Sequence, residues 1–169
     1  MQLERTLIVF KPHAVKRGIV GEILTRFEKV GLKVVGTKML QPTTEHYHHH
    51  YEAIGKMITR RGEKTFNIAL GMMNEGPVLA MVLEGVEAVS LVRKMVGGTE
   101  PKSSAPGTIR GDYSHLSFAH ADKVDSDVYN VIHASGDPEE AAMEIAHWFA
   151  EGELFTYETA HDILVHKKK

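Results

Sequence analysis

The sequence predicts an α/β fold with a four-stranded antiparallel sheet covered by helices. Short apolar runs, which are typical of buried strands, alternate along the chain with stretches whose apolar residues recur at helical spacing. The chain has 169 residues, of which 43% are hydrophobic, and this suffices for one domain with one core. We therefore expect a single domain over residues 1–169, with a C-terminal extension from about residue 156.

The first two strands flank a helix. Leu7–Phe10 is a continuous apolar run ended by Lys11-Pro12, and it is typical of a strand that is buried on both faces. Apolar residues at helical spacing then predict a helix over about 19–30, which is followed by a glycine stop signal. The second strand is expected over 32–40.

A helical hairpin and the third strand come next. Thr43 or Thr44 is placed to cap a helix that carries an apolar stripe of tyrosines and isoleucine. Apolar residues at positions i, i+3, i+4 and i+7 predict a second helix over 63–73. The third strand is expected over 78–83.

The last part of the chain adds a helix, a long loop, a strand and a helix. The helix is expected over 86–96, and the segment from 98 to about 127 has the composition and length of a functional loop. A short strand is expected over 130–133, and Asp137 is placed to cap the final helix, which has proline at its first position. This order contains a split βαβ pair and predicts a ferredoxin-like βαββαβ sandwich, with the inserted hairpin and with helices on one face of the sheet.

Composition excludes several classes of protein. The formal net charge is −2, with no long run of one sign, so a dedicated nucleic-acid surface is disfavoured. The chain has no cysteine, which excludes disulfides, zinc-finger sites, cysteine nucleophiles and iron–sulfur clusters. No stretch approaches 18 uninterrupted apolar residues, and the N-terminal residues lack the layout of a signal peptide. We expect a soluble cytoplasmic protein without a membrane segment.

The chain has 11 histidines, and six of them fall in two clusters. His46 and His50 are spaced i, i+4, which would suit a metal site on a helix. An exposed polar helix face is the favoured alternative, because no nearby carboxylate pattern completes a four-ligand site. The clustered residues are His46, His48, His49, His50, His161 and His166.

Neither common phosphate-binding loop is present. The sequence contains no G-x-x-x-x-G-K-[ST] motif and no G-x-G-x-x-G motif after a strand. Side chains would have to hold any phosphate, and Lys11, Arg93 and Arg110 are placed at the edges of predicted elements to do so. Arginine suits polyphosphates because its planar guanidinium binds two oxygens at once, whereas lysine supplies a compact charge. A surface cation remains the alternative for each of them.

His133 is the most informative single residue. It follows an apolar strand and comes just before a capped helix, where free backbone N–H groups favour an anion such as a phosphoryl group. A neutral imidazole is a competent nucleophile near pH 7. The residues alone leave two alternatives open, a nucleophile and a structural histidine.

These residues fall into motifs that strongly resemble the nucleoside diphosphate kinase family, over residues 4 to about 155. The strand-end motif Asn-x-x-His-x-Ser, at Asn130–Ser135, and the Gly-Thr-Ile-Arg-Gly-Asp loop, at Gly107–Asp112, are the most specific. Shorter matches are Val9-Phe10-Lys11-Pro12, Arg17-Gly18-Ile19-Val20-Gly21-Glu22-Ile23, His50-Tyr51, Gly76-Pro77-Val78, Met81-Val82-Leu83-Glu84-Gly85 and Arg93-Lys94.

The resemblance implies a ping-pong kinase with a phosphohistidine intermediate. A nucleoside triphosphate would give its γ-phosphate to His133, and a second nucleoside diphosphate would collect it. Lys11 would then contact the transferring group and the ribose 3′-hydroxyl, Arg93 and Arg110 the β- and γ-phosphates, Thr99 a phosphate oxygen, and Asn130 the sugar.

The resemblance assigns supporting roles as well. Tyr51 would hydrogen-bond near the phosphoryl group, Ser135 would support the loop after the nucleophile, and Glu144 would orient the imidazole. Phe66 has two alternatives, a ring that stacks on the base and a core residue of its own helix. No metal ligand is expected on the protein, because Mg²⁺ would arrive with the nucleotide phosphates.

The chain departs from the family pattern at several places. His13 and Ala14 follow Lys11-Pro12 in place of an acidic residue and glycine, which changes the charge beside the lysine. The chain is about six residues longer between Tyr51 and Gly76, within the segment 52–65. A second extra segment covers 114–127. Gly136 stands where the family often has an acid.

The resemblance also implies partners. We expect nucleoside di- and triphosphates as substrates, namely ATP and ADP, GTP, CTP, UTP and the deoxy forms, with little selection among bases. A homo-oligomer is expected, a hexamer ahead of a tetramer. Two other classes are alternatives: a silent nucleotide-binding module, which should lack His133, and a histidine-rich metal-binding protein. Lys167–Lys169 are expected to form a solvated tail.

Overall fold

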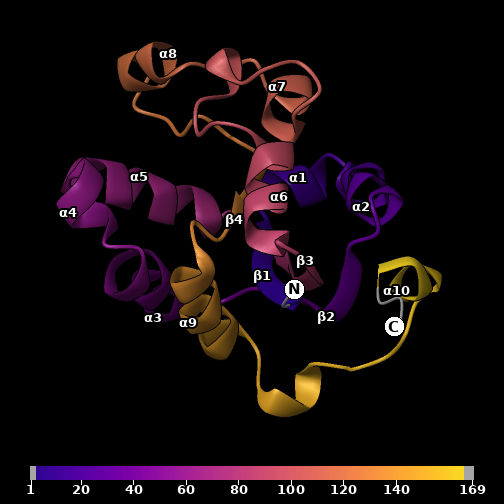
Figure 1. Cartoon of the computed structure of the whole chain (residues 1–169). Coiled ribbons are helices and arrows are strands. Elements are labelled where there is room, and N and C mark those ends of the chain that lie inside the picture. Colours follow the sequence, from indigo (N-terminus) through magenta and orange to yellow (C-terminus); the bar gives the residue numbers. More distant parts are fainter. Residues whose placement is uncertain (1–2, 166–169) are drawn as a thin grey trace.

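The computed structural model describes residues 3–165. Its four strands form one antiparallel sheet in the order β2-β3-β1-β4, which confirms the ferredoxin-like prediction (Figure 1). The strands are β1 (Leu3–Phe10), β2 (Lys33–Leu40), β3 (Val78–Val86) and β4 (Ile132–Ala134).

The helices connect and cover these strands. The N-terminal half contains α1 (Pro12–Lys16), α2 (Val20–Lys29), α3 (Thr44–His48), the π-helix η1 (His49–Ile54), α4 (Met57–Arg61) and α5 (Glu63–Met73). The C-terminal half contains α6 (Ala88–Val96), η2 (Pro101–Ser103), α7 (Ile109–Tyr113), α8 (Phe118–Lys123), α9 (Pro138–Trp148), η3 (Glu151–Glu153) and α10 (Ala160–Val165). Among the described residues no helix is both long and apolar enough to cross a bilayer.

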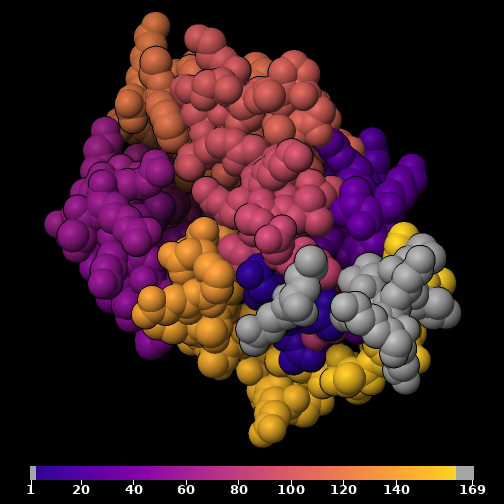
Figure 2. Space-filling view, viewed as in Figure 1, coloured from indigo at the N-terminus to yellow at the C-terminus, as the bar shows by residue number. Residues whose placement is uncertain are grey.

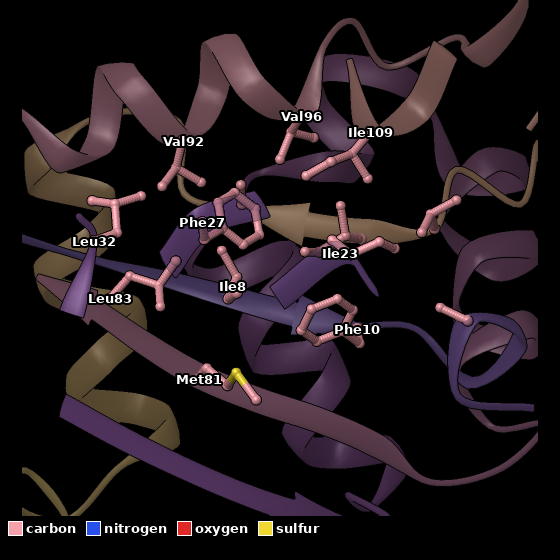
Figure 3. Packing of buried hydrophobic residues seen from close by; sticks show 14 of the residues in the cluster. Ile8, Phe10, Ile23, Phe27, Leu32, Met81, Leu83, Val92, Val96 and Ile109 are labelled. Carbon is pink, nitrogen blue, oxygen red and sulfur yellow. The ribbon is translucent and has the colours of Figure 1, made fainter. Parts of the chain in front are cut away.

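One face of the sheet packs against α2 and α6. Alternate residues of β1 point to this face, because successive side chains of a strand point to opposite sides. Figure 3 shows the resulting core, in which strand residues meet side chains of both helices and of α7. Its labelled members are Ile8, Phe10, Ile23, Phe27, Leu32, Met81, Leu83, Val92, Val96 and Ile109.

The other face is covered as well, so the prediction of helices on one face was wrong. Leu7 and Val9 of β1 point to this second side and pack with residues of α3, η1, α5 and α9. Tyr47 and Trp148 are among the large side chains buried there. The continuous apolar run of β1 follows directly from this double covering, because both sets of alternating residues lie in a core.

The element carrying His133 also differs from the prediction. β4 begins at Ile132 rather than at residue 130, because Tyr129 and Val131 have positive φ angles, 43° and 72°, that a strand does not accept. His133 therefore lies in the middle of the strand, where it pairs with Val9. The segment 98–127 holds η2, α7 and α8 within the predicted loop, and Thr108 and Ser117 cap the latter two.

The chain after α9 runs along β2 (Figure 1, yellow). The backbone N–H of Phe155 donates to the carbonyl of Val35 at 2.8 Å, and the Tyr157 hydroxyl donates to the carbonyl of Val34 at 2.6 Å. Lys33 Nζ lies 2.8 Å from Glu84 Oε1. The predicted tail Lys167–Lys169 lies outside the described residues.

Removing a large core side chain should test the α2 packing. Phe27→Ala deletes a ring that is fully buried between α2 and the sheet, and such changes cost about 3–5 kcal/mol of stability. We expect this loss in the free energy of unfolding measured with urea. Glu28→Ala, on the exposed side of the same helix, should change it by less than about 0.5 kcal/mol. Equal effects of the two substitutions would contradict this packing.

Candidate active site

A cleft of about 270 Å³ lies where β1 ends and β4 begins. Figure 2 shows the hollow between the magenta α4–α5 region and the pink and orange segment with α7 and α8. Segments that are far apart in the sequence meet here. The predicted residues that line the cleft are Lys11, Tyr51, Arg93, Thr99, Arg110, Asn130 and His133.

His133 presents one ring nitrogen to the protein interior. Its Nε2 lies 2.8 Å from Glu144 Oε1, and the side chain of His133 is 20% exposed. No described residue forms a hydrogen bond with the other ring nitrogen, Nδ1. The carboxylate fixes the tautomer with the proton on Nε2, so the Nδ1 lone pair is available for chemistry.

Glu144 and Ser135 form the support behind this imidazole. The Ser135 hydroxyl donates to Glu144 Oε2 at 2.6 Å, and the carboxylate is only 1% exposed. Ser135 is also tied to β1, because the Leu7 backbone N–H donates to its Oγ at 3.2 Å. The arrangement joins the nucleophile candidate, α9 and the sheet through one carboxylate. Neither Ser135 nor Glu144 lines the cleft.

Two arginines from different helices meet at the cleft. Arg110 of α7 is 5% exposed and donates to four backbone carbonyls, of Gly97, Gly98, Asn130 and Ile132, at 2.8–3.3 Å. Burial, followed by nearby positive charge, lowers the pKa of Arg110 to about 10. Arg93 of α6 donates to the Ala134 carbonyl at 3.4 Å. Their mutual repulsion is the kind that a bound polyphosphate relieves.

Gly97 lets these two helices approach. It ends α6 with a φ of 87°, and a Cβ at this position would lie 2.7 Å from Thr108 Oγ1, just before α7. Only glycine combines that backbone conformation with such a close contact. Gly97 therefore brings α7 and its Arg110 beside the last turn of α6 and its Arg93.

Lys11 supplies a third cation. It directly follows β1, is 7% exposed, and its backbone N–H donates to the Val131 carbonyl at 3.1 Å. Burial lowers the pKa of the Lys11 ammonium to about 8, while Asp127 opposes this shift. The lysine is thus a cation whose charge is sensitive to pH just above neutrality.

Two buried polar atoms in the cleft have no partner among the described residues. They are the Tyr51 hydroxyl and Asn130 Oδ1, whereas Asn130 Nδ2 donates to the Thr99 carbonyl at 3.0 Å. A buried unpaired polar atom costs about 1–3 kcal/mol unless a ligand or water satisfies it. Both residues line the cleft, and this pattern fits a polar ligand.

A π-helix places Tyr51 and its neighbour together at this site. The turn His49–Ile54 is wider than an α-helix, a distortion that is frequent at functional sites. His50 is 2% exposed, and its ring lies 4.6 Å from that of His133 at an interplanar angle of 82°. The consecutive residues His50 and Tyr51 of this turn therefore both lie near His133.

The family model described as Nucleoside diphosphate kinase matches residues 4–154. The chain belongs to the nucleoside diphosphate kinase family. It is 45% identical over 168 residues to the nucleoside diphosphate kinase of Pyrococcus furiosus, covering 99% of this chain and 96% of that protein. The enzyme of Borreliella burgdorferi is 42% identical over 159 residues, and the match covers 93% of each chain.

Solved structures agree with this membership. A transition-state mimic of nucleoside-diphosphate kinase from Borrelia burgdorferi, with bound vanadate and ADP, has a TM-score of 0.92 at 40% identity and covers 96% of each chain. The kinase of Halobacterium salinarum in complex with CDP has a TM-score of 0.82 at 35% identity, and the match covers 98% of this chain and 99% of that chain. The predicted family and fold are confirmed, and this protein is a phosphotransferase of nucleotides.

The structure of this kinase corrects the stacking alternative for Phe66. The ring is 4% exposed in the core beneath α5 and meets His48 edge-on at 5.3 Å, and it does not line the cleft. Of the two alternatives, the core residue is the one observed. Thr65 precedes it and faces the cleft, because a step of one residue along a helix turns the side chain by about 100°.

The kinase places further residues in the cleft that the sequence did not single out. Arg60 and Arg61 come from α4, inside the longer segment, and Phe118 and Asp127 come from the second extra segment. The adjacent Arg60-Arg61 pair was a visible signal of a basic surface. Glu140 also lines the cleft, and its Oε2 accepts the backbone N–H of Gly136 at 2.5 Å.

His13 does not add a charge beside Lys11. Its Nε2 accepts the backbone N–H of Val131 at 2.9 Å, and burial lowers the pKa of His13 to about 4. The ring is therefore neutral near pH 7. The hydrogen bond to His13 stabilises the backbone of Val131, which has a positive φ angle and directly precedes β4.

Two of the clustered histidines stack on His147 of α9. The ring of His46 lies 3.9 Å from that of His147, and the ring of His49 lies 4.4 Å from it. A separate group, His50, His133 and Glu144, holds metal-ligand atom types within 4.8 Å. Hydrogen bonds already engage His50 Nδ1 and His133 Nε2, so this geometry favours an internal network.

The low pKa of Lys11 should appear in the pH dependence of the kinase. Lysine is charged below its pKa, so attraction for phosphate is lost as pH rises through about 8. We expect kcat/KM, which reports the free enzyme, to fall toward about tenfold per pH unit above that value. In Lys11→Arg, which stays charged, the residual activity should lack this decline. An unchanged alkaline limb in the variant would assign it to another group.

Proposed function

We propose that His133 Nδ1 is the atom of this kinase that accepts the phosphoryl group in ping-pong transfer. The carrying observation is the hydrogen bond at 2.8 Å between His133 Nε2 and Glu144 Oε1, which leaves Nδ1 as the free nucleophile. Nδ1 belongs to a side chain that lines the same cleft as Arg93 and Arg110. Phosphoryl transfer depends mainly on such positioning and charge stabilisation.

The residues then act in two half-reactions. The Nδ1 lone pair forms a bond to the γ-phosphorus while the bond to the bridging β-oxygen breaks, and the nucleoside diphosphate leaves. Glu144 stabilises the positive charge that develops on the imidazole, which keeps its Nε2 proton. A β-phosphate oxygen of the acceptor diphosphate then attacks the same phosphorus and restores neutral His133.

The cleft cations stabilise the charge that spreads over the phosphate oxygens. Arg93 and Arg110 would contact the β- and γ-phosphates, because both side chains line the cleft and guanidinium groups bind phosphate oxygens in pairs. Lys11 would contact the transferring group and the ribose 3′-hydroxyl. The Tyr51 hydroxyl and Asn130 Oδ1 would receive their missing partners from the phosphoryl group and the sugar. Thr99, beside Asn130, would contact a phosphate oxygen.

Mg²⁺ fits this site as an ion brought by the nucleotide. Among the described residues two carboxylates line the cleft, Asp127 and Glu140, and these are too few to coordinate the ion without oxygen atoms from the nucleotide. Glu140 occupies the space that a side chain at Gly136 would fill, so it offers a carboxylate where the chain lacks the family's acid. When bound, the ion would neutralise negative charge on the phosphates of the nucleotide.

A second cavity of about 320 Å³ adjoins the cleft and would receive the base. It shares Arg61, Thr65, Phe118, Asp127 and Val128 with the cleft, and His133 does not line it. Phe118 of α8 presents a half-exposed aromatic ring at this boundary. We place the base on this ring, where stacking accepts every base, and the extra segment 114–127 supplies the contact.

Assembly and location complete the proposal. From membership in the family we propose a homo-oligomer, a hexamer ahead of a tetramer. The apolar side chains of Val30 and Met39, which are 51% and 59% exposed in the single chain, are candidates for contacts between subunits. The absence of cysteine fits the reducing cytoplasm. The substrates would be the common ribo- and deoxyribonucleoside di- and triphosphates.

The nucleophile is tested by His133→Ala. Incubation with γ-labelled ATP and Mg²⁺ should label the wild-type protein with an acid-labile, base-stable phosphate that a different nucleoside diphosphate then removes as triphosphate. The variant should lose transfer by at least about 10⁴-fold and keep nucleotide binding, since no phosphate-binding cation is removed. Wild-type nucleotide binding without label would point to a silent binding module. Loss of nucleotide affinity in the variant would indicate a structural histidine.

The base contact is tested by Phe118→Ala. Loss of a stacking ring costs about 1–3 kcal/mol, so KM should rise about fivefold or more for ADP, GDP, CDP and UDP alike. Phe155→Ala is the matched control, because this exposed phenylalanine lies beside β2 and does not line either cavity. A KM unchanged by Phe118→Ala would place the base elsewhere.

A further inference from the structure

Behind the nucleophile lies a second buried histidine that has its own partner. The Trp148 indole Nε1–H donates to His50 Nδ1 at 3.1 Å, and both side chains are 2% exposed. His50 Nδ1 also lies 3.6 Å from Glu144 Oε1, the same oxygen that binds His133 Nε2 at 2.8 Å. One carboxylate oxygen therefore lies within reach of two histidines.

The indole decides which form His50 takes. A nitrogen that accepts a hydrogen bond must carry a lone pair, so the proton of neutral His50 is on Nε2. Protonation of Nδ1 would direct its N–H against the indole N–H, with two donors facing each other. Burial also lowers the pKa of His50 well below its ordinary value, and neighbouring histidines add to this effect.

Most charged groups around His50 disfavour a positive charge on its ring, and two carboxylates favour it. Lys11 and the other three histidines disfavour a positive charge on the ring, as do the arginines of α4 that line the small cavity beside it. The carboxylates of Glu144 and Glu140, which line the same small cavity, favour that charge. The groups that face His50 are Glu140, Glu144 and His147 of α9, His133 of β4, His46 of α3, Arg60 and Arg61 of α4, Tyr51 of η1, and Lys11 after β1.

We infer that Trp148 and His50 are positioning residues that keep the Glu144 carboxylate for His133. With Nδ1 held as an acceptor, His50 cannot donate to Glu144 Oε1. The carboxylate then stabilises only the imidazole that takes up the phosphoryl group. A protonated His50 would compete for this oxygen and weaken the support of His133.

This inference deepens the proposed function and rests on His133 as the nucleophile. It also makes a statement about His50 that needs no catalysis. In Trp148→Phe the ring is replaced by another aromatic ring without the N–H, so His50 Nδ1 becomes free to take a proton and to pair with Glu144.

The first test is the titration of His50, followed by the nitrogen chemical shifts of the labelled histidines. In the wild-type protein neutral His50 should carry its proton on Nε2. In Trp148→Phe the proton of neutral His50 should become free to occupy Nδ1, and the pKa of His50 should be higher than in the wild-type protein. A His50 signal that titrates alike in both proteins, or a wild-type proton on Nδ1, would overturn the inference even if His133 proves to be the nucleophile.

The second test is the rate of phosphoenzyme formation between pH 5.5 and pH 8.5. The loss in Trp148→Phe should be several-fold larger at pH 5.5 than at pH 8.5, because protonated His50 then competes for Glu144. His50→Gln, which cannot titrate, should remove this pH-dependent excess when combined with Trp148→Phe. Tyr47→Phe, a change of a hydroxyl in the same core, should leave the profile unchanged. A loss that is equal at all pH values would show a merely structural role and would contradict the proposal.

Discussion

The burial of one carboxylate, that of Glu144, constrains much of this protein. A carboxylate removed from water is costly unless its oxygens receive hydrogen bonds. Here His133 and Ser135 supply them, at 2.8 Å and 2.6 Å. Ser135 is bonded to β1 in turn, and Asp137 caps the helix that carries the carboxylate. The sheet, α9 and the nucleophile are thus held in one arrangement because the charge must be satisfied.

Local signals explain how much of the fold could be predicted from the sequence. The helix Glu63–Met73 and the capped start of α9 at Pro138 were predicted at the observed residues, because apolar spacing and capping are properties of the chain nearby. The covering of both sheet faces was missed, although the continuous apolar run of β1 already indicated it. The start of β4 was missed because two residues adopt positive φ angles without being glycine, a choice made by tertiary contacts such as that from His13.

The residues of the candidate site also differ in whether the local sequence could predict them. His133 could be singled out from a strand followed by a capped helix, and Lys11 from a strand end. Glu144 came only through the family resemblance, because nothing in its local sequence distinguishes it from the other acids of α9. The sequence could not predict which aromatic ring lines the cavity proposed for the base. Phe66 and Phe118 both lie on helices, and only the folded structure shows which of them faces the core and which faces the cavity.

The segment that runs beside β2 has a consequence for how the polypeptide is made. An exposed strand edge presents unpaired backbone groups to any neighbouring chain and favours aggregation. Part of this edge is covered by the bond from Phe155 to Val35, and Phe155 leaves the ribosome long after the strand itself. During synthesis the edge of β2 therefore stays exposed in the nascent protein until the residues around Phe155 have been made. Shortened forms that end after α9 would keep that edge open and would be prone to self-association.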